Sequence, residues 1–412
     1  MLPEGWHRST LGEIARISSG GTPDRAEPKY WGGDVPWVTT GEIQFNTITD
    51  TNEKITEAGL KYSSAKLFPP GTLLMAMYGQ GKTRGQVAKL GIEAATNQAC
   101  AAILLPEMHD TDFFFQYLSS QYEAIRELGN AGTQQNLSGG ILKEVPVPVP
   151  PLSEQRRIAR VLSTWDQAIA ATERLLANSR RQKQMLLTML TGGIRRLGAS
   201  LAAWRTFKLG DLGAVYGGLS GKSGEDFGIG SKFIPYVNVF NNYRIDLAAL
   251  GLVKVASDEK QSRVQFGDVL FTTSSETPNE VGMAAVLLDE VEELFLNSFC
   301  FGYRLHDFGT LLPEYAGYVL RSPAIRSQMT QLAQGSTRFN ISKTQVMRLT
   351  IQLPSIEEQR LIIETLHCAS SAVEHLSGYL RHLRTEKTAL MAQLLTGKRR
   401  VSLPGRQAAT AL

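Results

Sequence analysis

The sequence predicts an α+β protein in which two mixed α/β domains alternate with two long helices. Two observations lead to this fold class. Residues 151–158, Pro-Leu-Ser-Glu-Gln-Arg-Arg-Ile, return as residues 355–362, Ser-Ile-Glu-Glu-Gln-Arg-Leu-Ile, with Glu154 aligned to Glu358 at a shift of 204 positions. Each copy opens a long stretch of apolar residues at helical spacing, preceded by glycine-rich sequence with short apolar runs. Because solenoid repeats measure about 20 to 50 residues, the longer period indicates two copies of a module with one domain and one helix.

Residues 1–150 are expected to form the first mixed domain. Short apolar runs predict strands at Pro36–Thr39, Thr72–Tyr78 and Ala99–Leu105, and turn formers rich in glycine and proline separate them. Between Thr111 and Leu128, apolar side chains recur at helical spacing and predict one helix.

Residues 151–197 predict the first long helix, with Ser153 as its N-cap and Gly192 as its stop. Alternating steps of four and three residues along it pass mostly through apolar positions, which is the pattern of a coiled-coil seam. The apolar seam positions are Ile158, Leu162, Ile169, Leu176, Leu186 and Leu190. At about 1.5 Å per residue the helix measures about 60 Å, and it needs a partner along this seam.

Residues 198–354 repeat the order of the first domain with poorer matching. Leu11–Ile14, for example, corresponds to Leu209–Leu212. Between such matches the copies diverge, and Tyr78–Arg84 stands opposite Thr272–Thr277. A shared scaffold with unlike loops predicts two related domains that bind different targets.

Residues 355–400 predict the second long helix, with Gly397 as its stop, and residues 401–412 form a C-terminal tail. The apolar positions of its seam are Ile362, Leu366, Val373, Leu376, Leu380, Leu383, Leu390 and Leu394. The two seams most simply pack together as an antiparallel coiled coil, which predicts a pseudo-two-fold arrangement with one domain near each end. Packing of each helix on its own domain or on a partner protein stays open as an alternative.

Composition indicates an ordinary globular protein, with 42% hydrophobic residues, 20% charged residues and a net charge of +4. No run of 18 apolar residues and no signal peptide is visible, so we expect a cytoplasmic protein without a membrane partner. The three cysteines are too scattered for a disulfide framework or a zinc site. Basic residues gather near the helix ends, including Arg195, Arg196, Arg399 and Arg400, where they either contact phosphates or complement the helix dipoles.

One motif suggests nucleotide binding, because Ala76–Thr83 fits a loose phosphate-loop pattern that ends in Gly-Lys-Thr. The mechanism requires that loop to open a helix whose N-terminus holds phosphate. Here Arg84–Ala88 reads as further loop and strand, and the second copy has no Gly-Lys-Thr. An ATPase is therefore disfavoured, and the six histidines show no metal-ligand spacing. We expect a binding protein with no catalytic residue, no metal site and no cofactor of its own.

The loops carry residue types that read nucleic acid. Planar amides can pair with adenine and guanidinium groups with guanine, while lysine holds phosphate. The candidate DNA-binding residues are Tyr78, Gln80, Lys82, Arg84, Gln86, Gln134, Gln135, Asn238, Asn241, Tyr243, Thr273, Ser275 and Arg338. At each position a structural role in a turn is the alternative. Asn136–Ser138 and Asn340–Ser342 occur in both copies and are expected to belong to the scaffold.

The tandem layout resembles the specificity (S) subunits of type I restriction-modification systems over essentially the whole chain. The resemblance rests on the Trp-x4-Leu-Gly-Glu-Ile opening at residues 6–14, the Gly-Thr-Pro turn at 21–23 and the Val-Pro-Trp-Val strand at 35–38. The Pro-Leu-x-Glu-Gln-Arg-Arg-Ile helix entry at 151–158 and the Leu-Leu-Thr-Gly endings complete it. It implies two target-recognition domains that each read one half of a bipartite target in double-stranded DNA.

The same resemblance implies how the work is divided among subunits. The paired helices act as a spacer and as a dock for two methyltransferase subunits, which methylate adenine with S-adenosylmethionine. Restriction subunits, where a system has them, use ATP and Mg²⁺ to translocate and cleave DNA. This chain would direct both activities and catalyse neither. The competing hypothesis is a non-catalytic assembly scaffold that has no direct contact with bases.

Overall fold

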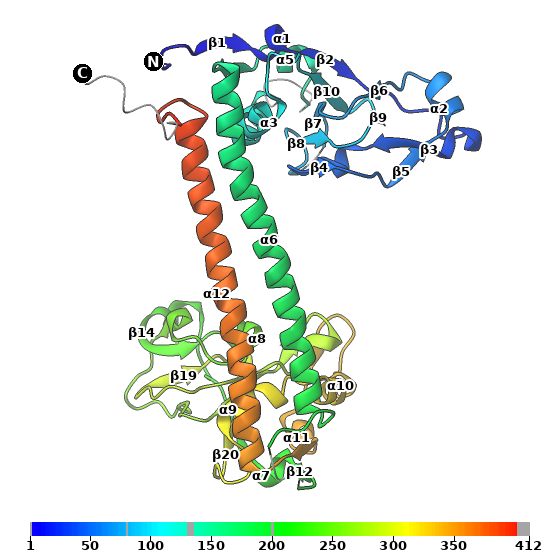
Figure 1. Ribbon diagram of the computed structural model, residues 1–412. Helices are drawn as coiled ribbons and strands as arrows, with labels where there is room; N and C mark the ends of the chain where they lie inside the picture. Colours follow the sequence, from blue (N-terminus) through cyan, green and yellow to red (C-terminus); the bar gives the residue numbers. More distant parts are fainter. Residues whose placement is uncertain (1, 80, 130–135, 199–201, 402–412) are drawn as a thin grey trace. The chain divides into compact units, whose positions relative to one another are not determined.

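The computed structural model describes residues 2–79, 81–129, 136–198 and 202–401 (Figure 1). The chain divides into two compact units. The first comprises residues 1–173 and 378–412, and the second comprises residues 174–377. The division therefore falls inside both long helices, so that each unit holds one globular domain together with part of each helix.

The two long helices are α6, Leu152–Thr191, and α12, Ile356–Leu394. Their segments run antiparallel in the first unit. In the first unit Lys387 Nζ contacts Asp166 Oδ1 at 2.5 Å, and Arg384 lies 2.6 Å from Glu173, so rising numbers on one helix meet falling numbers on the other. None of the predicted seam residues is exposed: Ile158, Leu162, Leu176, Leu190, Ile362, Leu366, Leu380, Leu383 and Leu394 are buried, and Ile169, Leu186, Val373, Leu376 and Leu390 are half-buried.

Within its described residues, the globular domain of the first unit contains three sheets and five short α-helices. Its two-stranded sheet pairs β1 (His7–Thr10) with β11 (Pro146–Val149). The five-stranded sheet has the order β2 (Arg16–Ser19), β10 (Cys100–Leu104), β7 (Leu73–Ala76), β8 (Val87–Leu90) and β4 (Thr47–Ile48). The four-stranded sheet has the order β5 (Glu53–Ile55), β3 (Trp31–Val38), β9 (Ala94–Thr96) and β6 (Leu67–Phe68). The α-helices are α1 (Leu11–Ile14), α2 (Glu57–Lys61), α3 (Thr111–Ser120), α4 (Tyr122–Leu128) and α5 (Gly139–Lys143).

The second unit follows the same order of sheets, but its two larger sheets each have one strand fewer than those of the first unit, and a further two-stranded sheet, β17-β21, is present. Its sheets have the orders β12-β22, β13-β20-β16-β18, β15-β14-β19 and β17-β21. The strands are β12 (Arg205–Lys208), β13 (Gly213–Gly217), β14 (Phe227–Ile234), β15 (Gly251–Val253), β16 (Val269–Thr272), β17 (Ser274–Ser275), β18 (Ala284–Val286), β19 (Leu294–Leu296), β20 (Cys300–Leu305), β21 (Phe339–Asn340) and β22 (Thr350–Leu353). The α-helices of its domain are α7 (Leu209–Leu212), α8 (Tyr236–Asn241), α9 (Pro313–Val319), α10 (Pro323–Gln331) and α11 (Lys343–Val346).

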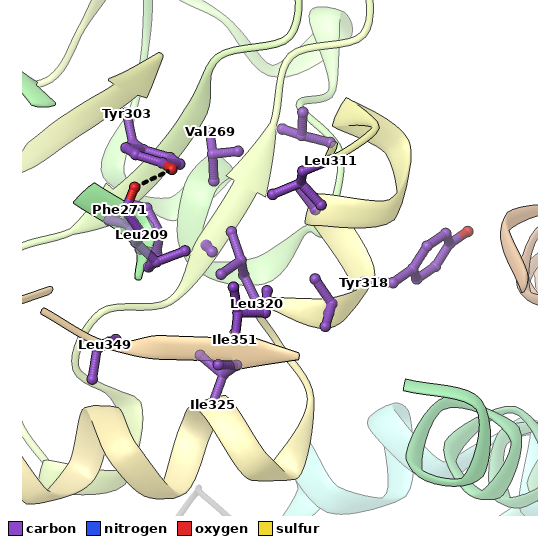
Figure 2. Close-up of a cluster of buried hydrophobic side chains, with 14 of the residues drawn as sticks. Leu209, Val269, Phe271, Tyr303, Leu311, Tyr318, Leu320, Ile325, Leu349 and Ile351 are labelled. Carbon is purple, nitrogen blue, oxygen red and sulfur yellow. Dashed lines mark hydrogen bonds between the residues drawn. The ribbon is translucent and has the colours of Figure 1, made fainter. Parts of the chain in front are cut away.

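The central strands are apolar on both faces because alternate side chains point to opposite sides of the sheet and a hydrophobic cluster covers each side. In β7, Leu73 and Met75 join a core cluster with α3 and α6, whereas Leu74 and Ala76 join a second cluster on the other face. In the second unit, Val269 and Phe271 of β16 face a large cluster that includes Tyr303 (Figure 2). Leu270 faces the opposite side and joins another cluster. The Tyr303 hydroxyl donates to the carbonyl oxygen of Leu209 at 2.7 Å, which satisfies the one polar atom that this ring brings into the core (Figure 2).

Two local predictions are wrong. The helix expected from Thr111 to Leu128 is two helices, because Gln121 takes φ −96° and ψ 10° and ends α3 before α4 begins. The second copy has Pro323 where its helices α9 and α10 separate, but the first copy has no proline to signal the break.

Ser153 is not the N-cap of α6, since the helix begins at Leu152 and the Pro151 carbonyl accepts from the backbone N–H groups of Glu154 and Gln155. In the second copy Ser355 takes the capping position instead, and its Oγ accepts from Glu358 N at 3.3 Å.

Candidate nucleic-acid interface

The most faithfully repeated residues form a buried joint rather than a binding site. In the first unit Glu154, at the start of α6, is 1% exposed. It accepts from the indole Nε1 of Trp6 at 3.1 Å, and from Arg400 Nη2 at 2.7 Å and Nε at 3.1 Å. Burial by itself would raise the pKa of Glu154, but the hydrogen bonds from Arg400 and Trp6 outweigh it and hold the pKa below its ordinary value.

The second unit has the same joint at the start of α12. Glu358 accepts from Trp204 Nε1 at 3.3 Å and from Arg196 Nε and Nη2, each at 2.7 Å. Burial acts to raise the pKa of Glu358, and the hydrogen bonds from Arg196 and neighbouring groups lower it on balance. We call these two joints the glutamate clamps. They assign a buried ion-pair partner to Arg196 and Arg400, two of the basic residues near the helix ends.

The glutamine beside each clamp joins the helix to its domain. Gln155 Nε2 donates to the carbonyl oxygen of Pro150 at 2.8 Å, and its Oε1 accepts from the backbone N–H of Asp110 at 2.7 Å. Gln359 repeats both contacts, donating to the Pro354 carbonyl at 3.1 Å and accepting from Leu312 N at 2.9 Å. The repeated Glu-Gln pair therefore has a structural role, because it fastens the start of each long helix to a globular domain.

A different place in each unit gathers loops with unlike side chains. In the first unit it lies where β7 ends and β10 begins, since Met77 N donates to the Ala99 carbonyl at 2.8 Å and Leu137 N donates to the Met77 carbonyl at 2.9 Å. In the second unit Thr273 N donates to the Phe299 carbonyl at 2.9 Å, and Ile341 N donates to the Thr273 carbonyl at 3.0 Å. We call these places the reading edges, and in both the backbone alone ties three segments together.

The scaffold role expected for the two Asn-x-Ser segments agrees with these contacts. Leu137 and Ile341, the central residues, are buried. Ser138 Oγ accepts from Ile141 N at 3.2 Å and caps α5, and Ser342 takes the N-cap position of α11.

The loop from Met77 to Gly85 carries the first reading edge. Gly79, Gly81 and Gly85 have positive φ, and Gly85 N donates to the Ala76 carbonyl at 2.8 Å to close the loop. Of the predicted residues, Tyr78 and Lys82 are exposed, Gln86 is half-buried and Arg84 is buried. Gln80, Gln134 and Gln135 lie outside the described residues. The loop leads into strand β8 and not into a helix, which removes the geometry that a phosphate loop needs.

A polar hollow of about 500 Å³ adjoins Tyr78. Its lining includes Ser18, Ser19, Gln98 and Lys143, none of which the loop pattern singled out. These residues come from strand β2, from the turn before β10 and from helix α5, so only the fold brings them together.

The predicted residues of the second unit divide between edge and scaffold. Arg338 is exposed and Thr273 is half-buried at the edge. Ser275 is buried in strand β17, which pairs with β21. Asn241 is exposed at the end of α8.

Asn238 is 3% exposed, and its Nδ2 donates to the carbonyl oxygens of Asp246 and Ala249 at 2.8 and 3.1 Å. Tyr243 stacks on Tyr318 with ring centroids 4.7 Å apart, and Lys183 Nζ lies 5.2 Å from its ring centroid. The second reading edge as we define it therefore omits Asn238, Tyr243 and Ser275, whose side chains are engaged within the fold. The physical reason is that buried amides and hydroxyls satisfy internal carbonyls, which their type in the sequence does not disclose.

Phe299 is the residue of the second edge that the sequence pattern missed. Its side chain is 55% exposed, and the guanidinium carbon of Arg338 lies 5.8 Å from its ring centroid. The signal was present in the alignment of the copies, because Asn97-Gln98-Ala99-Cys100 stands opposite Asn297-Ser298-Phe299-Cys300.

In the described part of the chain, no three His, Cys, Asp or Glu side chains come together as a metal site would need. No helix in the same ranges has the length and apolar character for crossing a membrane.

Comparison with known proteins supplies the family context. The family model described as "type I restriction modification DNA specificity domain" matches residues 3–178 and again residues 202–375, once in each copy of the repeat. The MjaIX specificity subunit of a type I restriction enzyme from Methanocaldococcus jannaschii is 28% identical over 190 residues, which cover 45% of this chain and 42% of that protein. The MjaVIII specificity subunit of the same organism is 20% identical over 97% of this chain and 94% of its own length.

The fold is also found among solved structures. The crystal structure of a type I restriction-modification S subunit from M. genitalium superposes with a TM-score of 0.58 at 16% identity, covering 95% of this chain and 96% of that one. This likeness confirms the predicted fold class of tandem mixed domains with two long helices.

Proposed function

Because the chain belongs to the type I restriction modification DNA specificity domain family, we propose that it selects the DNA sequence for a type I restriction-modification complex. Each unit reads one half of a bipartite target, and the long helices fix the spacing of the halves and dock the methyltransferase subunits. The observation that carries the proposal is the pair of reading edges. One backbone frame appears twice, and it presents different side chains each time.

The chemistry of the edges supports contact with DNA. The first presents Tyr78, Lys82 and Gln98 from neighbouring segments, and the second presents Arg338 beside Phe299. Cations hold phosphates or pair with guanine, and amides pair with adenine, so each edge carries both positioning and reading groups. Two edges with different groups favour two different half-sites.

Catalysis in this proposal belongs to other subunits. Two methyltransferase subunits carry S-adenosylmethionine, and restriction subunits carry ATP and Mg²⁺. Glu154 and Glu358, the most buried carboxylates at the helix entries, are held in ion pairs with Arg400 and Arg196. The clamps thus serve the scaffold that positions the edges.

A methylation map tests the proposal. The chain is co-expressed with its methyltransferase subunits, and modified adenines are located across the host genome. We expect one bipartite motif whose two halves are separated by a fixed number of unspecified bases. Assembly of the complex without any such motif would contradict the proposal and favour a scaffold that reads no bases.

Lys82 provides a second, quantitative test. Replacing Lys82 by Ala should weaken DNA binding to all sequences alike and reduce the slope of log Kd against log salt concentration by about one, as loss of a phosphate contact does. Lys61→Ala in helix α2 is the matched control, because Lys61 is also exposed in the same unit but lies off the reading edge. Equal salt slopes for the two variants would remove Lys82 from the interface.

A further inference from the structure

We propose that Phe299 determines specificity in the second half-site, where its ring makes apolar contact with the 5-methyl group of a thymine. The inference rests on the proposed function and adds one residue and one chemical group of the DNA to it. Among the standard bases thymine alone carries a methyl group in the major groove, and phenylalanine is one of the side chains that contact it.

The backbone holds Phe299 rigidly while its side chain points outward. Asn297 Oδ1 accepts from Phe299 N at 2.8 Å, and the Phe299 carbonyl accepts from Thr273 N at 2.9 Å. Cys300 then starts strand β20, where its side chain is buried. Because its N–H and carbonyl groups are both hydrogen-bonded, the backbone of Phe299 needs no reordering on binding, and only the rotamer of the ring has to be fixed.

The surroundings of the ring suit DNA. Arg338 lies beside it with its guanidinium carbon 5.8 Å from the ring centroid, and both side chains project from segments that meet at Thr273. An apolar ring next to a cation matches a ligand with negative phosphates and scattered methyl groups.

The first unit holds the same frame with a different residue. Asn97 Oδ1 accepts from Ala99 N at 3.1 Å, and the Ala99 carbonyl accepts from Met77 N at 2.8 Å. Ala99 cannot extend beyond the edge as Phe299 does. There the exposed aromatic is Tyr78, which comes from the neighbouring loop. The two edges therefore place an aromatic ring at different positions, which fits two half-sites of different sequence.

The opposite end of the same strands supplies a matched control. Phe266 precedes β16 and Phe308 follows β20, whereas Thr273 and Phe299 lie at the other ends of these strands. At about 3.3 Å per residue the four residues of β16 separate the two ends by about 13 Å. Phe266 and Phe308 are each 40% exposed and contact one another edge to face, with ring centroids 6.1 Å apart. Phe266→Ala thus removes an exposed ring, 40% accessible against 55% for Phe299, from the opposite end of the same strands and away from the edge.

The test uses the full chain assembled with its methyltransferase subunits. After the methylation map has defined the motif, each thymine of the second half-site is replaced in turn by uracil, which removes only the 5-methyl group. The parent complex should bind about fourfold more weakly at one such position, the effect of losing one buried methyl group. Phe299→Ala should bind the thymine duplex about fourfold to tenfold more weakly than the parent complex does. Its affinity should not change when uracil replaces thymine at that position. Phe266→Ala should keep both the affinity and the uracil response.

The outcomes separate this inference from the proposed function. A parent complex without a bipartite motif contradicts the proposed function. A clear motif with no methyl-sensitive thymine in its second half, or a Phe299→Ala complex that keeps the full uracil response, overturns the role of Phe299 alone. Should Phe299→Ala not assemble, Phe299→Gln replaces it, because glutamine keeps the reach of the side chain without the ring. It must show the same loss of the uracil response.

Discussion

The glutamate clamps and the reading edges are both duplicated, but the two copies of the clamp share their side chains whereas the two copies of the edge share only their backbone. At the clamps, Glu154 and Glu358 have the same indole and guanidinium partners in both units. At the edges, Ala99 and Phe299 share a backbone frame but not a side chain. A buried carboxylate can be replaced only together with its partners, whereas an exposed side chain on a backbone-bonded frame can change with little effect on stability. The side chains that differ between the two edges therefore lie where backbone hydrogen bonds hold the fold.

Breaking a clamp should give the largest effect. Glu358→Ala leaves Arg196 and Trp204 without their acceptor, and the expected loss is about 3 kcal/mol in the free energy of unfolding of the second unit. Chemical denaturation followed by tryptophan fluorescence measures it. Glu357→Ala is the control, since Glu357 is the exposed neighbour on the same helical turn. If both variants lose the same stability, the clamp does not hold the joint. The methylated motif of any Glu358→Ala complex that assembles should be unchanged.

Substitution of Asn238 tests whether this buried residue belongs to the reading edge of the second unit or only to its scaffold. Asn238→Ala removes a buried amide that donates to two backbone carbonyls, and the expected loss of stability is about 2 kcal/mol with no change in the recognised sequence. Thermal unfolding and the methylation map provide the two measurements. Asn241→Ala, at an exposed position on the same helix, should leave stability within about 0.5 kcal/mol of the parent. A new motif in the Asn238→Ala complex would return this residue to the reading surface.

Low pH should weaken the clamps, with a smaller effect on stability than the two substitutions above. The hydrogen bonds hold the pKa values of Glu154 and Glu358 below their ordinary value of 4.5, which applies to the unfolded chain. The stabilisation is then fully present above pH 4.5 and is lost as the pH falls through the lower folded-state values. Melting temperatures measured from pH 6 to pH 3 should therefore fall more steeply for the parent than for Glu358→Gln, which has no proton to bind at that position. Parallel curves would mean that protonation of Glu358 is not linked to unfolding.

The architecture followed from periodicity, because the heptad pattern and the repeat are long signals that few structures satisfy. The strands at Leu73–Ala76 and Cys100–Leu104 lie inside the predicted runs for the same reason. Side-chain roles were less accessible. Asn238 and Arg338 belong to residue types that suit both turns and bases, and only burial separates them. The break at Gln121 depends on backbone geometry without a proline or glycine to announce it.

The first clamp joins residues that are 246 positions apart in the chain, and the core around Ile158 also takes in Leu394 and Leu395. The second unit lies wholly between residues 174 and 377 and closes its clamp across 162 positions. During synthesis on the ribosome, the second unit consequently has all its residues before the first, although the first is translated earlier. The core of the first unit is therefore incomplete until α12 has been synthesised, and the face that packs against Leu394 and Leu395 stays uncovered until then.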